Sequence, residues 1–317
     1  MMLSRRKFIS TMAVAGAAVP FTSTLASFTD VHAENKFPIR LFSKPIDNYD
    51  FNFMCECLVK SGIGGFDLTV RPGGKVEPED VEINLPRLVE EARKNNLAID
   101  MMTSGIVSAK DLYTERVLKT SSALGVKHYR LGYLEYDNKV GVWESLQKHK
   151  SSLAEIVDLN HKYKIHGDYQ NHAGARVGGP VWDLYELLHE FPPEDIGCQY
   201  DVRHAMVEGA NSWIVGMRLI SKYIKTLAIK DFTWMTENGK PRAVTVPLGE
   251  GMVNWDTFFK TVKELKISCP MTLHIEYPLL EKGEEKLDLA QQQTIIVRKI
   301  KKDVDYLNAY LIKYQLV

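Results

Sequence analysis

From about residue 36 onward, short apolar runs alternate with longer segments in which apolar residues recur at helical spacing. Short apolar runs between polar turns are typical of buried strands, and recurrence at three- and four-residue intervals is typical of amphipathic helices. The pattern predicts strands at 37–42, 65–70, 97–102, 126–131, 167–172, within 196–204, and at 226–231 and 272–277. It predicts helices between and after them at 51–60, 79–96, 109–124, 143–162, 181–189, 213–223, 255–265 and 287–311.

This alternation predicts a single α/β domain of the (β/α)8 barrel type. Such a barrel needs about 250 residues, and no change of composition divides the segment that carries the pattern. A doubly wound open sheet is the alternative, but it usually has a glycine-rich dinucleotide-binding turn after its first strand. The residues after 42 contain no such turn.

The first residues form a different kind of segment. Ser4-Arg-Arg-Lys-Phe-Ile-Ser10 precedes an apolar stretch from Met12 to about Leu25, and Val31-His-Ala33 offers the small residues that a signal peptidase needs. The segment resembles a twin-arginine export signal. An uncleaved anchor is the other interpretation, but the apolar run is shorter than the roughly 20 residues of a spanning helix, and Pro20 breaks it. We therefore expect a signal peptide at 1–33 and a periplasmic barrel domain at 34–317 without a membrane anchor.

Composition and charge narrow the class of partner. The 317 residues are 45% hydrophobic, and 40 basic residues balance 40 acidic ones. A chain with no basic excess is a poor candidate for binding nucleic acid or an anionic membrane. The expected partner is a small molecule.

Polar side chains gather at the ends of the last four predicted strands. In a barrel of parallel strands all carboxyl ends face the same rim, so these side chains should converge on one pocket. They are Gln170 and His172, Asp201 and His204, Lys230 and Asp231, and His274 and Glu276. The histidines at 128, 149, 161, 166 and 189 follow no pattern that gives them partners.

Five short motifs carry a resemblance to a known family. They are Tyr169-Gln-Asn-His172, Asp201-Val-Arg-His204, Ile229-Lys-Asp231, the 247–251 loop with Asn254-Trp255, and His274-Ile-Glu276. Together they resemble the xylose isomerase-like barrels, which include sugar epimerases, inosose dehydratases and endonuclease-IV relatives. The endonuclease activity is not expected here, because those relatives need more metal ligands than this chain offers.

The resemblance implies a divalent metal held by Glu, Asp, His and Glu at the ends of strands five to eight. Those places fall on Gln170, Asp201, Ala228 and Glu276, so two of the four ligands are replaced. In one interpretation, manganese or magnesium remains on Asp201 and Glu276, helped by Gln170 and by nearby imidazoles. In the other, the metal is gone and a sugar is held by hydrogen bonds and by the charges of Lys230 and Arg130.

Such a pocket suits proton transfer beside the carbonyl of a sugar or keto-sugar. Isomerisation, epimerisation, dehydration and eliminative cleavage all remove a proton next to a carbonyl and must stabilise the enediolate that results. Glu276 is the predicted base, Lys230 or a metal the predicted stabiliser, and His204 with Asp201 the group that orients hydroxyls. The predicted substrate contacts are Arg130, Gln170, His172, Asp201, His274, Asp231 and Trp234. The alternative is a non-catalytic carbohydrate-binding or accessory barrel that has lost part of the metal site.

Overall fold

The computed structural model describes residues 36–316. The predicted signal peptide at 1–33, with its twin arginines and cleavage site, lies outside the described residues. No helix of the described part is both long and apolar enough to span a lipid bilayer.

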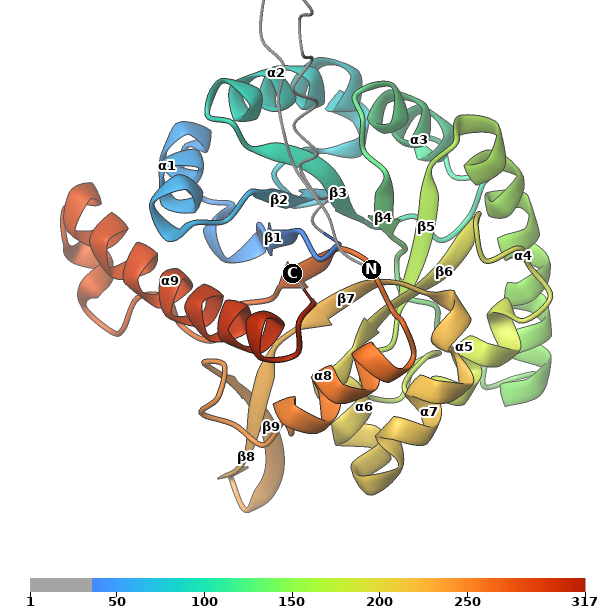
Figure 1. The fold of residues 1–317 in the computed structure, drawn as a ribbon. Helices are drawn as coiled ribbons and strands as arrows, with labels where there is room; N and C mark the ends of the chain where they lie inside the picture. Colours follow the sequence, from blue (N-terminus) through green and yellow to red (C-terminus); the bar gives the residue numbers. More distant parts are fainter. Residues whose placement is uncertain (1–35, 317) are drawn as a thin grey trace, which may run out of the picture. The chain divides into compact units, whose positions relative to one another are not determined.

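Eight parallel strands close into a barrel (Figure 1), in the order β1-β10-β7-β6-β5-β4-β3-β2. The strands are β1 Ile39–Phe42, β2 Gly65–Val70, β3 Ala98–Ser104, β4 His128–Arg130, β5 His166–Gln170, β6 Ile196–Asp201, β7 Ile224–Ile229 and β10 Met271–Leu273. Strands that pair in the barrel also follow one another in the sequence, except where β1 and β10 close it. A separate hairpin is inserted between β7 and β10. The predicted (β/α)8 barrel is confirmed.

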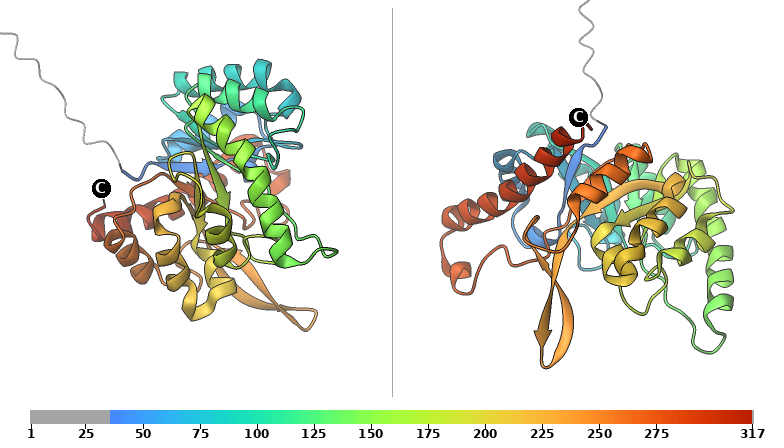
Figure 2. Two further views of the ribbon diagram at one scale, coloured as in Figure 1. Left: turned by 90° about the vertical axis from the view of Figure 1, so that its right-hand side faces the viewer. Right: turned by 60° about the horizontal axis from the view of Figure 1, so that its bottom comes forward.

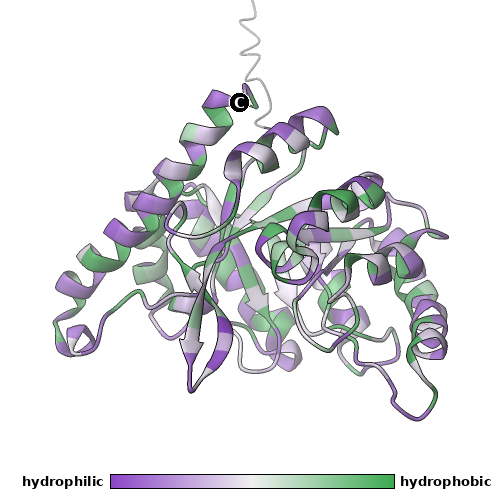
Figure 3. Cartoon of the chain, turned by 90° about the horizontal axis from the view of Figure 1, so that it is seen from below, coloured by the Kyte–Doolittle hydropathy of each residue, from purple (hydrophilic) through white to green (hydrophobic). Residues whose placement is uncertain are grey.

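Helices surround the barrel and turn their apolar sides toward it. They are α1 Phe51–Ser61, α2 Val81–Lys94, α3 Thr114–Ala123, α4 Val142–Tyr163, α5 Val181–Leu188, α6 Val202–Gly209, α7 Trp213–Leu219, α8 Trp255–Glu264 and α9 Leu289–Lys313. Figure 3 shows the hydrophobic and hydrophilic sides of these helices. The buried residues of α8, such as Phe258 and Phe259, belong to the same core as the outward-facing strand residues. The hydrophobic core therefore lies mainly between the strands and the helices.

The inside of the barrel is polar by comparison. Asp67 on β2 accepts hydrogen bonds from Thr103 on β3, at 3.0 Å, and from Thr272 on β10, at 2.9 Å. Because β1 separates β2 from β10, the bond to Thr272 crosses the barrel interior. Arg130 on β4 similarly lies over the ring of Phe42 on β1, with 5.7 Å from the guanidinium carbon to the ring centroid. Side chains two residues away on these strands face the same interior.

Two predicted elements differ from the structure, one at the end of the sixth strand and one at the end of the helix predicted after it. The expected strand within 196–204 ends at Asp201, and α6 begins with the next residue. The strand ends there because Asp201 caps the helix: its carboxylate accepts a hydrogen bond from the backbone N–H of His204 at 2.9 Å. The predicted helix at 213–223 ends at Leu219, and a 3-10 turn at Ser221–Tyr223 follows it.

The sequence analysis also missed an antiparallel hairpin, β8 Asp231–Glu237 and β9 Lys240–Val246. Its turn residues, Asn238 and Gly239, both have positive φ, 53° and 75°. Asn-Gly is the strongest short-range signal for such a turn, so the sequence did contain the information. Figure 2 shows the hairpin extending from the barrel as an addition to the eightfold pattern.

Candidate active site

Three charged side chains meet at the carboxyl ends of β6, β7 and β10. The Nζ atom of Lys230 lies 3.1 Å from Asp201 Oδ2 and 3.1 Å from Glu276 Oε2. Lys230 is 1% exposed and Asp201 is fully buried, whereas the side chain of Glu276 is 35% exposed. We call Asp201, Lys230 and Glu276 the charged cluster. Glu276 is the member that a ligand can approach.

Gln170, at the end of β5, links the charged cluster to Arg130. Its Nε2 donates to Asp201 Oδ2 at 2.9 Å. Its Oε1 accepts from Arg130 at 2.9 Å and from the Tyr133 hydroxyl at 2.6 Å. Since a guanidinium can only donate, this contact fixes which end of the amide faces Arg130. The Asp201 carboxylate is therefore held at both oxygens: Gln170 donates to Oδ2, and the first turn of α6 donates to Oδ1.

The imidazoles of His172 and His204 lie beside the charged cluster, with ring centroids 3.9 Å apart. His204 Nδ1 is 2.8 Å from an Arg203 nitrogen, which can only donate, so the proton of a neutral His204 is on Nε2. His172 Nδ1 is 2.9 Å from the carbonyl oxygen of Ala173, which can only accept, so His172 Nε2 carries the lone pair. The Nε2 atoms of the two rings thus have opposite hydrogen-bonding character: that of His204 donates and that of His172 accepts.

Both rings are held in the neutral form. Burial first, and then the charge of Lys230, lowers the pKa of His172 below its usual 6.5. The same two causes lower the pKa of His204 further, well below 6.5. His204 Nε2 is 3.7 Å from Asp201 Oδ2 and makes no hydrogen bond among the described residues.

His274 lies deeper and stacks on Phe42, with ring centroids 4.4 Å apart. Neither ring nitrogen of His274 makes a hydrogen bond within the described part of the chain, and Nδ1 is 3.9 Å from Glu276 Oε1. Burial is the main cause that lowers the pKa of His274 below 6.5. The ring is therefore a neutral wall of the site.

The contact between Lys230 and Glu276 favours the charged form of both side chains. Burial opposes the charge on Lys230, but Asp201 and Glu276 outweigh it and raise the pKa of Lys230 above 10.5. Burial likewise opposes ionisation of Glu276, but His274 and Lys230 outweigh it and hold the pKa of Glu276 well below 4.5. A buried ion pair of this kind is costly to break, because removing one partner leaves an uncompensated charge.

Asp231 and Trp234 are not part of the charged cluster. The Asp231 carboxylate accepts from the backbone N–H groups of Phe232, Gly249 and Val253 at 2.8, 3.0 and 3.0 Å, and from the Trp255 indole at 3.0 Å. These bonds hold the 247–255 segment, so Asp231 shapes a loop. Trp234 stands on the hairpin, 46% exposed, with its ring edge-on to Phe232. No hydrogen bond or ring contact joins Trp234 to the charged cluster in residues 36–316.

The donor set at this end of the barrel does not fit a divalent metal. Lys230 Nζ occupies the position between the two carboxylates, where its ammonium supplies the positive charge. Gln170 directs its carbonyl oxygen to Arg130 and Tyr133 and its amide nitrogen to Asp201. Ala228, at the register position beside Asp201, offers no ligand atom. The positive charge between the two carboxylates is therefore that of Lys230.

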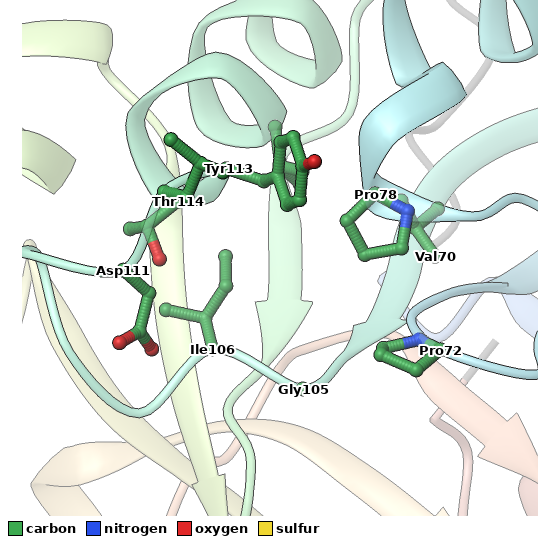
Figure 4. Close-up of a pocket in the computed structure, with 10 residues that line it drawn as sticks. Val70, Pro72, Pro78, Gly105, Ile106, Asp111, Tyr113 and Thr114 are labelled. Carbon is green, nitrogen blue, oxygen red and sulfur yellow. The ribbon is translucent and has the colours of Figure 1, made fainter.

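A cavity of about 160 Å³ lies near the ends of two other strands, and no member of the charged cluster lines it. Figure 4 shows it between the ends of β2 and β3, with Pro72, Ile106 and Tyr113 among its lining residues. Arg71, between two lining residues, places its guanidinium 5.7 Å from the centroid of Phe42, the residue on which His274 stacks. Arg71 therefore reaches the site through Phe42, but it does not line the cavity.

Sequence reasoning missed several residues of this site. Tyr133 and Arg203 contact Gln170 and His204, and Phe42 packs on His274. Phe42 ends the predicted first strand and Tyr133 follows the fourth, so their positions at the carboxyl rim were the available signal. At the other end of the barrel, His128 and His166 both contact Asp168, a grouping that the sequence analysis did not foresee.

Comparison with known proteins supports the fold. Solved structures that resemble this chain include a probable 3-DHS dehydratase, AsbF, from Bacillus anthracis, with 13% identity, a TM-score of 0.63 and coverage of 86% of this chain and 99% of that one. D-psicose 3-epimerase from Clostridium cellulolyticum H10, solved with D-tagatose, has 11% identity, a TM-score of 0.65 and coverage of 87% and 99%. An L-ribulose 3-epimerase has 11% identity, a TM-score of 0.65 and coverage of 88% and 96%.

The identities are too low for these structures to show more than the fold. No curated protein matches the chain significantly. The family model described as xylose isomerase-like TIM barrel matches residues 56–296, which is most of the barrel. The chain therefore belongs to the xylose isomerase-like TIM barrel family.

Proposed function

We propose that this protein is an enzyme that moves a proton at a carbon next to the carbonyl of a sugar or keto-sugar. The outcome is an isomerisation, an epimerisation or an eliminative loss. The observation that carries the proposal is the contact of a buried lysine with a partly exposed carboxylate, Lys230 with Glu276 at 3.1 Å, at the carboxyl rim of the barrel. The epimerases and the dehydratase among the similar structures are consistent with this class of reaction.

In the proposed step, Glu276 takes the proton from the carbon. The electrons of the broken C–H bond form a carbon–carbon double bond, and negative charge develops on the former carbonyl oxygen. Lys230 stabilises that charge: an ammonium has three N–H donors, and two face Asp201 and Glu276, which leaves one for the oxygen. Return of the proton by Glu276 to the neighbouring carbon gives the isomer, and an epimer forms when a second acid, such as a bound water, protonates the opposite face. In an eliminative reaction, the electrons of the enediolate instead expel a hydroxyl group from the next carbon, which leaves as water after it takes up a proton.

The low pKa of Glu276 makes it a weak base while Lys230 remains in contact with it. A substrate oxygen that draws Lys230 toward itself weakens this contact and makes the carboxylate more basic. The lysine thus couples the strength of the base to the presence of a carbonyl oxygen. Glu276 therefore becomes a stronger base only when a substrate carbonyl oxygen is bound.

Neighbouring groups are suited to hold the sugar hydroxyls. His204 Nε2–H is a donor without a hydrogen bond, and His172 Nε2 is an acceptor. Arg130 and Gln170 complete a polar wall on the β4 and β5 side. The positive charge is supplied by Lys230 without a metal at this end of the barrel.

The test is solvent exchange in deuterated water with a panel of ketoses and aldoses, followed by proton NMR. Wild type should lose the signal of a proton next to a carbonyl, and Glu276→Gln should abolish exchange while sugar binding, measured by calorimetry, stays within about threefold. Glu281→Gln, at an exposed carboxylate paired with Lys299, is the matched control and should exchange normally. Binding by wild type without any exchange would instead identify a carbohydrate-binding barrel.

A further inference from the structure

A second group of ionisable side chains lies at the amino-terminal end of the barrel. His128 begins β4, His166 begins β5, and the two are register partners. Asp168, two residues further along β5, is 1% exposed and faces the same interior as Gln170. His128 Nδ1 lies 3.0 Å from Asp168 Oδ2, and His166 Nδ1 lies 3.1 Å from Asp168 Oδ1. We call these three residues the β4–β5 triad.

The orientation of His166 is the one that metal-binding histidines usually have. Its Nε2 is 3.1 Å from the carbonyl oxygen of Pro193, which can only accept, so Nε2 carries the proton of the neutral ring. Its Nδ1 then presents a lone pair to the triad. A ligating histidine commonly donates its other N–H to a backbone carbonyl, which fixes both the tautomer and the ring plane.

Two buried atoms of the triad lack a hydrogen bond. Although His166 Nδ1 and Asp168 Oδ1 are 3.1 Å apart, neither has a hydrogen-bond partner among the described residues. Buried polar atoms normally have a partner, so two adjacent exceptions need an explanation. A cation between them satisfies both the lone pair and the carboxylate oxygen.

The β6 side of the triad is closely packed. Gly197 is the register partner of Asp168 on β6, and a Cβ there would lie 3.0 Å from His166 Cε1 and 2.4 Å from the Tyr223 carbonyl oxygen. Lys225 also lies near Gly197, and its positive charge would repel a cation at the triad. The Asp168 carboxylate, in contact with both imidazoles, offsets it.

We propose that His128, His166 and Asp168 bind a divalent transition-metal ion of the zinc type. One ligand atom from each residue can be chosen so that all three lie within 4.8 Å of one another. Two imidazole nitrogens and one carboxylate oxygen suit Zn²⁺, Co²⁺ or Ni²⁺, whereas Mg²⁺ and Ca²⁺ prefer oxygen ligands. Water completes the coordination.

The bound ion fastens β4 to β5. It lies at the amino-terminal end of the strands, where barrel residues serve stability, and so has no part in reactions at the carboxyl rim. The proposal does not depend on the proposed carbohydrate chemistry.

The test uses the purified barrel domain after removal of metal with a chelator. Zn²⁺ binding is measured by calorimetry, Co²⁺ binding by its visible absorption, and stability by thermal melting. Wild type should bind one Zn²⁺ and melt at a higher temperature with it. His166→Gln and Asp168→Asn should each weaken binding at least tenfold and abolish the shift. His161→Gln is the matched control, since His161 is exposed and lies 3.4 Å from Asp195, and it should bind as wild type does.

Two further measurements test the site without requiring that a triad variant folds. In the wild-type barrel domain with ¹⁵N-labelled histidine, Zn²⁺ should shift the ring signals of two of its eight histidines. Glu276→Gln should retain Zn²⁺ binding, because its carboxylate is at the other end of the barrel. The proposal is overturned if wild type binds no Zn²⁺ at about 100 µM, which would place the dissociation constant above roughly that concentration. Loss of binding in Glu276→Gln, or full binding in His166→Gln and Asp168→Asn, overturns it equally.

Discussion

At the scale of single residues, Lys230 determines the chemistry of the site. Its ammonium contacts two carboxylates in a position that the family resemblance assigns to a metal. The sequence located Asp201, Lys230 and Glu276 at strand ends, because each follows a short apolar run. It could not show that Lys230 lies between the carboxylates, since that depends on the packing of three strands far apart in the chain.

Replacing Lys230 should destabilise the protein strongly. Lys230→Met leaves the buried Asp201 without its cation, and loss of one member of a buried pair costs about 3 to 5 kcal/mol. Lys301→Met, which removes an exposed partner of Asp305, should cost under about 1 kcal/mol. Urea unfolding gives both free energies. Equal losses for the two variants would show that the Lys230 pair contributes no more than a surface contact.

The acid limb of the pH–rate profile should distinguish Glu276 from His172 as the base. Because the pKa of Glu276 in the free protein lies well below 4.5, its ionised form persists as the pH falls, and kcat/KM, which reports the free enzyme, should stay level down to about pH 5. A neutral His172 would instead become protonated as the pH falls through a pKa somewhat below 6.5. An acid limb in that range that is absent from His172→Gln would assign the base to His172.

At the scale of elements, the differences between prediction and structure lie where local chemistry overrides the apolar pattern. Asp201 both ends β6 and caps α6, so a segment interpreted as one strand contains a helix start. The hairpin after β7 was missed although Asn238 and Gly239 mark its turn. Both signals are short and polar, so the pattern of apolar runs does not reveal them.

The attachment of α9 should depend on pH through Asp303. Its carboxylate accepts from the Leu248 N–H at 3.0 Å and from the Tyr277 hydroxyl at 2.9 Å, and burial raises its pKa from 3.8 to about 6. A raised pKa adds stability that is fully present below pH 3.8 and is lost as the pH rises through about 6.

Asp303→Asn removes this titration. The stability of wild type relative to Asp303→Asn should therefore fall by up to about 3 kcal/mol between pH 4 and pH 7. Chemical denaturation of both proteins across this range measures the difference. A difference that does not change with pH would contradict the assignment.

At the scale of the whole molecule, the fold was the most predictable feature. Eight strand and helix pairs in sequence leave few topologies open, and the closed parallel barrel follows from them. The interior was less predictable, because neighbours such as Asp67, Thr103 and Thr272 come from strands that only closure of the barrel brings together.

We also expect the whole chain to be exported. Arg5 and Arg6 precede a modest apolar run, so replacing both with lysine should leave the chain unprocessed inside the cell. Cell fractionation with N-terminal sequencing of the mature protein, expected to begin near residue 34, is the measurement. Normal processing of the double variant would favour the general export route.

In the proposed mechanism, Lys230 rather than a metal supports proton transfer at the carboxyl rim. The direct measurement is deuterium incorporation into a ketose by wild-type protein that has been treated with a chelator, at a temperature where it stays folded. We predict exchange at a carbon next to the carbonyl, at a rate within about twofold of that seen with added Mn²⁺ or Mg²⁺. Exchange that appears only when one of these metals is added would contradict the claim.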